Sequence, residues 1–165
     1  MKHLLFGVLA ICVAAACSDS SNSGGQGSAD EAPLLSVEAP APLDVPAPVE
    51  VSSDTDWEAK VHNKEIEVLQ IINVINPIAA YITEGFNQYG DRFSDVLQEE
   101  WQDTQVQLTS AMTLYDSCKE RKSAGQFEKQ LFLDMEEVWQ ILVKTGVAGV
   151  RTNSMVDSEM RRLMR

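Results

Sequence analysis

Apolar residues spaced three and four positions apart run along the chain from residue 57 to residue 89. A stripe at this period over more than thirty residues predicts a long amphipathic helix. Pro77 falls opposite the stripe, so we expect a kink near residues 73–77 rather than two separate helices. The stripe consists of Trp57, Val61, Val68, Ile71, Ile72, Ile75, Ile78, Ala79, Ile82, Phe86 and Tyr89.

Two more stretches have the same periodicity. The first covers residues 92–122, and its very short connection around Gly90 predicts an antiparallel neighbour for the first helix. The second covers residues 126–145 and is expected to end where Gly146 and Gly149 interrupt the pattern. A short final helix is expected over residues 157–165, where apolar side chains again share one face.

No stretch alternates with a period of two between turn signals, so the sequence predicts no sheet. The fold class is therefore all-α: an antiparallel three-helix bundle with a short C-terminal helix, covering residues 55–165. Thr55 and Glu58 fit a capping box at its start, with Thr55 as the N-cap. Asp91 is the N-cap expected for the second helix.

The N-terminus has the features of a targeting segment. Lys2 gives a positive start, and residues 4–16 carry no charge and are almost wholly apolar. Thirteen helical residues span ~20 Å, whereas the hydrocarbon core of a bilayer is ~30 Å thick. The stretch is too short to span a membrane and has the length of the apolar region of a signal peptide.

This segment ends in Val-Ala-Ala-Ala-Cys at residues 13–17. Small residues before a cysteine resemble the lipobox of bacterial lipoproteins. The resemblance implies that residues 1–16 are removed as a signal peptide and that Cys17 carries the lipid that holds the protein at a membrane. Ser18 after the cysteine, where aspartate marks inner-membrane retention, implies sorting to the outer membrane. The alternative is an ordinary secretory signal cleaved after Ala16.

Residues 17–54 differ in composition from the rest of the chain. Five of the six prolines lie here, and residues 18–56 contain eight acidic side chains and no lysine or arginine. Few large apolar residues are present, so we expect a disordered tether that acts as a spacer. A short docking motif at Leu34, Leu35 and Val37 is the alternative function of this segment.

The net charge of −12 argues against nucleic-acid binding and against broad adhesion to an anionic membrane surface. Glu58, His62 and Glu65 share one helix flank, but a solvated flank is favoured over a metal site. The sequence has no base beside a nucleophile and no phosphate-binding loop, so we expect neither an enzyme nor a bound metal or cofactor. Cys118 lies on an apolar stripe and is expected to be buried, with an intermolecular disulfide as the alternative.

The helix lengths suggest a binding surface. The first two helices are each expected to extend ~45–50 Å and the third only ~30 Å, so the tip of the first hairpin would lack a covering helix. Its aromatic residues Tyr81, Phe86, Tyr89 and Phe93 are the candidate partner-binding residues. The third helix has a second apolar strip, which we expect the C-terminal segment to cover: Phe132, Trp139 and Val143.

These features predict a lipoprotein anchored in the outer membrane through Cys17, with a non-catalytic helical bundle that faces the periplasm or is exposed on the cell surface. The bundle is expected to bind an envelope or periplasmic protein during recruitment, assembly or inhibition. The alternative is a structural envelope lipoprotein that self-associates through its long helices. The sequence leaves the oligomeric state open.

Overall fold

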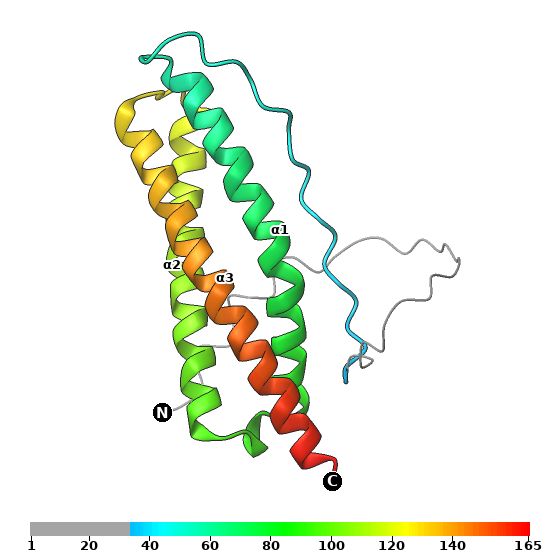
Figure 1. Ribbon diagram of the computed structural model, residues 1–165. Helices are drawn as coiled ribbons and strands as arrows, with labels where there is room; N and C mark the ends of the chain where they lie inside the picture. Colours follow the sequence, from blue (N-terminus) through cyan, green and yellow to red (C-terminus); the bar gives the residue numbers. More distant parts are fainter. Residues whose placement is uncertain (1–33) are drawn as a thin grey trace, which may run out of the picture. The chain divides into compact units, whose positions relative to one another are not determined.

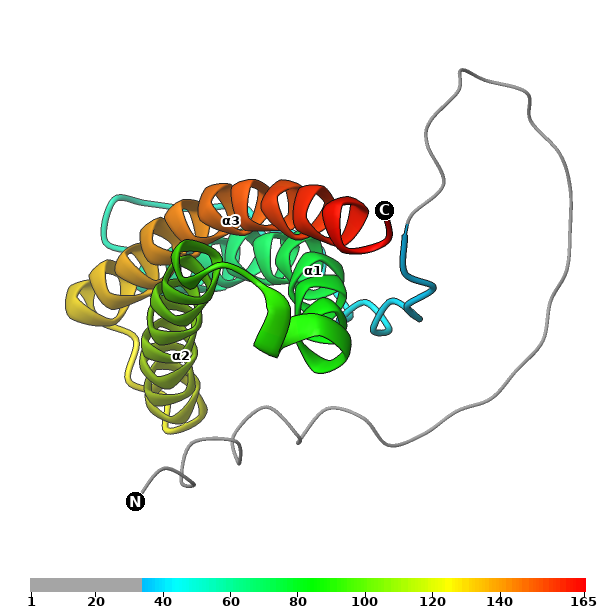
Figure 2. The same ribbon diagram turned by 90° about the horizontal axis from the view of Figure 1, so that it is seen from below.

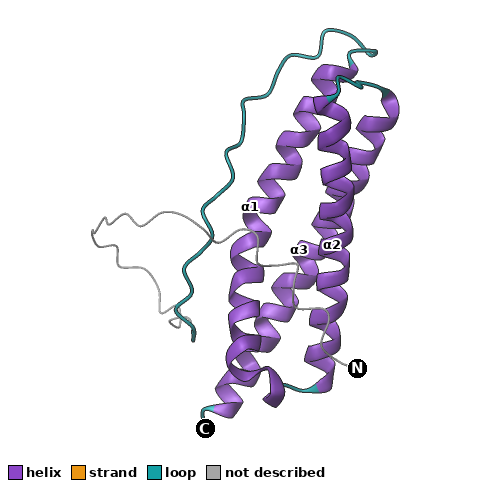
Figure 3. Ribbon diagram, turned by 180° about the vertical axis from the view of Figure 1, so that it is seen from behind, coloured by secondary structure: helices purple, strands orange, loops and turns teal. Residues whose placement is uncertain are grey.

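The computed structural model describes residues 34–165 (Figure 1). It contains the α-helices α1 (Trp57–Tyr89), α2 (Asp95–Ser123) and α3 (Lys129–Leu163), and the short 3₁₀ helix η1 (Gly90–Arg92) between α1 and α2. No strand occurs within these residues, as the colouring in Figure 3 shows. The structure confirms the all-α class and the three packed helices.

The helix α3 packs along both other helices. It runs parallel to α1 and antiparallel to α2, and it lies against each of them over much of its length. The backbones of α1 and α2 are farther apart from each other, as the end-on view in Figure 2 shows. Thus α3 connects the two arms of the first hairpin.

The break expected at Gly146 and Gly149 is wrong, because α3 continues as a single helix to Leu163. A glycine in a helix costs only ~1 kcal/mol relative to alanine, and packing offsets such a cost. Beyond Leu142 the buried face continues with the same spacing, through Thr145, Gly149, Thr152, Val156 and Met160. The first three of these residues are small or polar, so a search for periodic apolar residues does not detect this part of the face. The expected separate C-terminal helix is the last part of α3.

Two helix starts also differ from the sequence expectation. Asp56, not Thr55, caps α1, and its carboxylate accepts a hydrogen bond from the Ala59 N–H at 3.1 Å. Hydrogen bonds from Ser52 lower the pKa of the Asp56 carboxyl. The cap of α2 is Ser94 rather than Asp91, because η1 occupies the first residues after α1.

The buried side chains form two core clusters. The first core cluster lies toward the start of α1 and includes Val61, Tyr115, Leu131 and Met135. The second core cluster lies at the η1 end and contains Leu35, Ile82, Phe93, Leu97, Trp101, Val156 and Met160. The second core cluster therefore takes residues from all three helices and from the segment before them.

The folded unit begins at Leu34, twenty-one residues before the expected boundary at residue 55. We call residues 34–51 the strap. The strap is extended and runs along α1 from the η1 end to the start of the helix (Figure 1). The expectation that residues 17–54 are a spacer without core contacts is wrong for this part, since Leu35 is buried and Leu34 and Val37 pack against the second core cluster. The signal peptide, Cys17 and the rest of the tether lie outside the described residues.

Candidate functional site

The aromatic residues proposed for the hairpin tip do lie together. Phe86 and Phe93 make an edge-to-face contact with ring centroids 5.1 Å apart, and Tyr89 lies 6.4 Å from Phe93. Phe86 also stacks on Trp101 at 6.0 Å. Tyr81 points toward α3, where its hydroxyl donates a hydrogen bond to Asp157 Oδ1 at 2.7 Å.

The tip is not left uncovered, which corrects the sequence expectation. The end of α3 supplies Val156 and Met160, and the strap supplies Leu35, so that Phe93 is buried among them. Phe86 and Tyr89 retain partly exposed rings. Burial raises the pKa of Tyr81 to about 12, and the hydrogen bond to Asp157 contributes to this shift. The tip is therefore part of the core in this conformation.

The second apolar strip of α3 is covered by α1 rather than by the C-terminal segment. Phe132 packs against Trp57, with ring centroids 6.1 Å apart. Trp139 lies under the ammonium group of Lys64, 5.0 Å from its ring centroid. Lys64 also forms an ion pair with Glu136 at 2.7 Å, so this face of α3 is an internal helix contact.

The flank of Glu58, His62 and Glu65 does not form one site. Glu58 is exposed, and His62 Nε2 lies 2.9 Å from the backbone oxygen of Ala47 in the strap. Glu65 is buried instead, where it pairs with Lys122 and accepts a hydrogen bond from the Tyr115 hydroxyl at 3.4 Å. Residues 34–165 contain no group of three ligands suited to a metal ion. The buried carboxylate of Glu65 thus links α1 to α2.

Cys118 is fully buried in the first core cluster, as the sequence predicts. Burial raises the pKa of its thiol to about 11. The thiolate is the reactive form of cysteine, so the thiol is protected both sterically and chemically.

We expect Cys118 to make the fold sensitive to alkali. The folded-state pKa lies above the unfolded value, so this group stabilises the fold fully below pH ~9, and that contribution disappears as the pH rises to ~11, by ~2–3 kcal/mol in total. Urea titrations at pH 8 and pH 11 measure the loss, and Cys118→Ala should reduce it only by the share of the thiol, because the raised pKa of Tyr81 produces an alkaline loss of the same sign. An equal alkaline loss in that variant would contradict the assignment.

A small hollow lies between the three helices, with a volume of about 10 Å³. Thr104 and Thr145 line it, but their hydroxyls already donate to the backbone oxygens of Glu100 and Ile141 at 2.8 Å. A space of this size holds at most about one water molecule. Without free polar groups it does not suit a ligand.

Two asparagines of α1 hold the strap through its backbone. Asn73 Oδ1 accepts the Leu43 N–H at 2.7 Å, and Asn73 Nδ2 donates to the Leu43 oxygen at 2.9 Å. Asn63 does the same to Val49, with distances of 2.9 Å and 2.8 Å. Each side-chain amide thus pairs with a residue in the way a neighbouring strand would.

The strap contains an internal repeat that the sequence analysis missed. Residues 40–45 read Pro-Ala-Pro-Leu-Asp-Val and residues 46–51 read Pro-Ala-Pro-Val-Glu-Val. Leu43 and Val49, the two residues paired with asparagines, are the fourth residues of the two hexapeptides. The pattern was visible in the sequence, but a proline-rich acidic composition also fits a spacer.

A group of exposed valines lies on the outer surface of α1 and α3. Val74, Val147 and Val150 are 63%, 70% and 56% exposed, and we call them the valine surface. Gly146 faces Ile75 and Gly149 faces Ile78, so Val74 of α1 is level with the two valines of α3. Three exposed valines at one level of two adjacent helices are the candidate interaction surface of the bundle.

The charge near the valine surface is opposite to that of the whole chain. Between Gln140 and Ser154 the only charged residues are Lys144 and Arg151, both exposed. Arg151 Nε lies 3.7 Å from Glu100 Oε1 of α2, and the Arg151 side chain is 69% exposed. Lys144 and Arg151 therefore lie beside the α3 part of the valine surface, and Glu100 partly balances the charge of Arg151.

The helix α1 contains a long apolar stretch. The segment Trp57–Arg92 is long and apolar enough to cross a membrane by length and composition alone, and only 28% of its most apolar stretch is buried. This is weak evidence for a membrane span. The exposed large apolar side chain of α1 is Val74, which belongs to the valine surface.

Comparisons with known proteins give no assignment. No protein-family model matches the chain, and no curated protein and no solved structure is significantly similar to it.

Proposed function

We propose that the protein is a lipoprotein anchored in the outer membrane through Cys17, whose periplasm-facing bundle is a non-catalytic protein-binding module. The observation that carries the binding role is the valine surface, where three large apolar side chains on two adjacent helices are more than half exposed. Its partner is an envelope protein with an apolar ridge bordered by acidic residues, because Lys144 and Arg151 flank the valines.

The structure favours this surface over the aromatic tip. The tip aromatics are packed by α3 and the strap, whereas the valine surface has no cover within the described residues. Full burial of an exposed valine yields roughly 1.5–3 kcal/mol. These valines are already partly covered, so each contributes less than that, and their burial together with the charges on the border has to offset the cost of association.

We expect Cys17→Ser to abolish anchoring, because the cysteine sulfur is the atom that would carry the lipid. The wild-type protein should partition with membranes and have the added mass of acyl chains, and the variant should do neither. Fractionation and intact-mass measurement test this. A wild-type mature N-terminus at Cys17 without acyl mass would refute anchoring and leave the binding role untouched.

We expect Val147→Glu with Val150→Glu to abolish partner binding without unfolding the domain. Both side chains are exposed, so the free energy of unfolding should change by no more than ~0.5 kcal/mol each. A photocrosslinking residue at position 154 in intact cells should capture the partner, and the double variant should reduce that capture at least tenfold.

Val106→Glu is the matched control, since Val106 is 59% exposed but lies on α2 away from the valine surface. Capture should be unchanged in this variant. Equal capture by the double variant and wild type would rule out the valine surface as the docking site. A captured species with the mass of a second copy would favour the self-associating alternative.

A further inference from the structure

The recognition of the strap depends on backbone groups and not on side-chain identity. Asn63 and Asn73 each bind both the N–H and the carbonyl oxygen of a strap residue. The bound residues must therefore have a free N–H, which proline lacks. In both hexapeptides the bound residue directly follows a proline and supplies that N–H.

The spacing of the two asparagines fits the repeat of the strap. An extended proline-rich chain rises ~3.1 Å per residue, so the two bound residues are ~19 Å apart. Ten helical residues rise ~15 Å and leave the second asparagine rotated by ~80° around α1. A strap that crosses the helix obliquely covers both distances. The strap face of α1 is therefore matched to two consecutive hexapeptides.

Most of the strap is weakly enclosed. Leu35 is its only buried residue, and residues 38–44 and 46–51 are all exposed. Hydrogen bonds at such exposed positions exchange readily with bonds to water. The part of the strap from residue 38 onward can therefore separate from α1 while the helices remain packed, and release of the whole strap also requires Leu35 to leave the second core cluster.

We propose that the strap face of α1 is an interaction surface that also accepts the strap of a second copy of this chain. The strap runs antiparallel to α1 and joins it through the turn at residues 52–56, as Figure 1 shows. Opening that turn places strap and helix in one line, and two copies then pair about a twofold axis with exchanged straps. Every contact to Asn63 and Asn73 is replaced by the same contact from the other copy.

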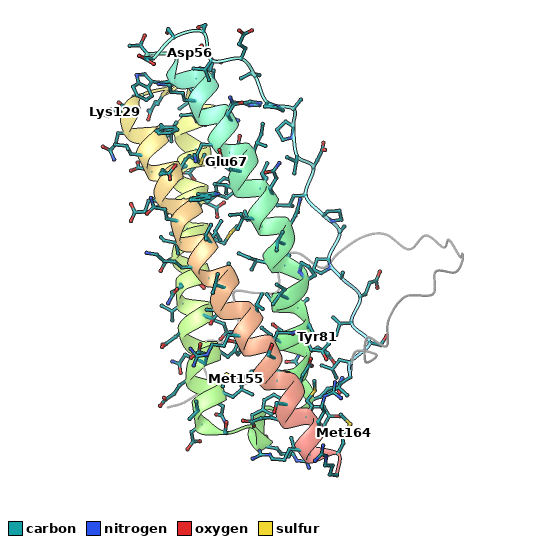
Figure 4. All side chains as sticks on the ribbon, in the orientation of Figure 1. Asp56, Glu67, Tyr81, Lys129, Met155 and Met164 are labelled. Atoms are coloured by element: carbon teal, nitrogen blue, oxygen red, sulfur yellow. The ribbon has the colours of Figure 1, made fainter. Side chains whose placement is uncertain are left out.

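This inference goes beyond the proposed function, because it needs neither the valine surface nor another protein. Tyr81, labelled in Figure 4, lies where the strap begins, and its hydroxyl contacts the backbone of Leu34 and Leu35. Exchange would therefore also transfer the Leu35 anchor to the other copy's second core cluster. Copies that are anchored in the same membrane should exchange straps most often. This condition rests on the proposed anchor at Cys17.

The test uses two complementary variants of the chain from residue 18 onward, which retains every described residue. The first variant, Leu43→Pro with Val49→Pro, keeps an extended strap but removes the two donated N–H groups, so its α1 face is vacant. The second variant, Asn63→Ala with Asn73→Ala, lacks the two amides that hold a strap on α1, so its own strap is released but keeps both N–H groups for binding. Each alone should be a monomer by sedimentation, and the mixture should form a heterodimer.

Ala41→Pro is the matched control for the first variant, because it adds a proline to the strap and keeps both bound N–H groups. Its mixture with the asparagine variant should associate at least tenfold more weakly. A mixture of the two complementary variants that stays monomeric at several hundred micromolar would overturn the proposal, provided both variants unfold cooperatively.

A second measurement keeps the proposal testable if the double-proline variant does not fold. A spin label on Asp44→Cys, in a Cys118→Ala background, is mixed with isotope-labelled wild-type chain. The proposal expects concentration-dependent broadening of the Asn63 and Asn73 side-chain amide signals. Signals that stay sharp at all concentrations would show that the strap binds only its own chain.

Discussion

Ending the chain after Gly146 is expected to abolish stable folding of the η1 half of the domain. The truncation removes Val156 and Met160, which are fully buried, together with the cover that α3 gives to Phe93 and Leu97. Each large buried side chain contributes roughly 1.5–3 kcal/mol, so the loss is ~5 kcal/mol or more. That is comparable with the whole stability of a small domain.

Circular dichroism and urea unfolding measure this effect. The truncated chain should lose helicity beyond the missing residues and should show a broad transition or none. A chain that ends at Leu163 is the control, since it lacks only the exposed Met164 and Arg165 and should unfold like wild type. Similar midpoints for both truncations would show that the last part of α3 does not hold the second core cluster together.

The helical architecture was predictable because it depends on periodic apolar residues, but the extent of α3 was not. Beyond Leu142 the buried face is made of Thr145, Gly149 and Thr152, with hydroxyls that donate to backbone oxygens one turn earlier. Such satisfied threonines pack like small apolar residues. Hydropathy does not register them, and this error, together with the interpretation of residues 34–51 as a spacer, produced the expectation of an uncovered hairpin tip.

The strap shows a different limit of sequence analysis. Its composition fits a disordered spacer, but the complementary asparagines on α1 and the burial of Leu35 in the second core cluster hold it in the extended form. Asn63 and Asn73 lie on the solvent flank of an amphipathic helix, where polar residues need no explanation. A match between a six-residue repeat and a ten-residue helical spacing becomes evident only when both segments are placed side by side.

The candidate interaction residues were predicted only in part. Tyr81, Phe86, Tyr89 and Phe93 do cluster, but Phe93 is buried in the second core cluster and the other three pack, partly buried, against it. The valine surface gave little sequence signal, because isolated valines at exposed helix positions are common. The three valines lie at the same height only because of the register in which α1 packs on α3. Gly146 and Gly149 determine this register through their contacts with Ile75 and Ile78.

A larger side chain at position 85 is expected to separate α1 from α3 at the second core cluster. A Cβ atom on Gly85 would lie 2.8 Å from Val156 Cγ1, closer than two carbon atoms can pack, and 3.6 Å from Leu35. Overpacking of this kind costs typically 1–3 kcal/mol, so we expect Gly85→Leu to lower the free energy of unfolding by ~3 kcal/mol. Urea unfolding measures the loss.

Gly149→Ala is the matched control within the same helix pair. Its Cβ would lie at an ordinary 3.6 Å from Ile78, so the better helix propensity of alanine should stabilise the domain by up to ~1 kcal/mol. Gly85→Ala gains the same propensity but meets Val156. Combining it with Val156→Ala should cost less than the sum of the two single changes, since the smaller partner relieves the contact. Strict additivity of the two changes would show that α1 and α3 do not approach each other closely at Gly85.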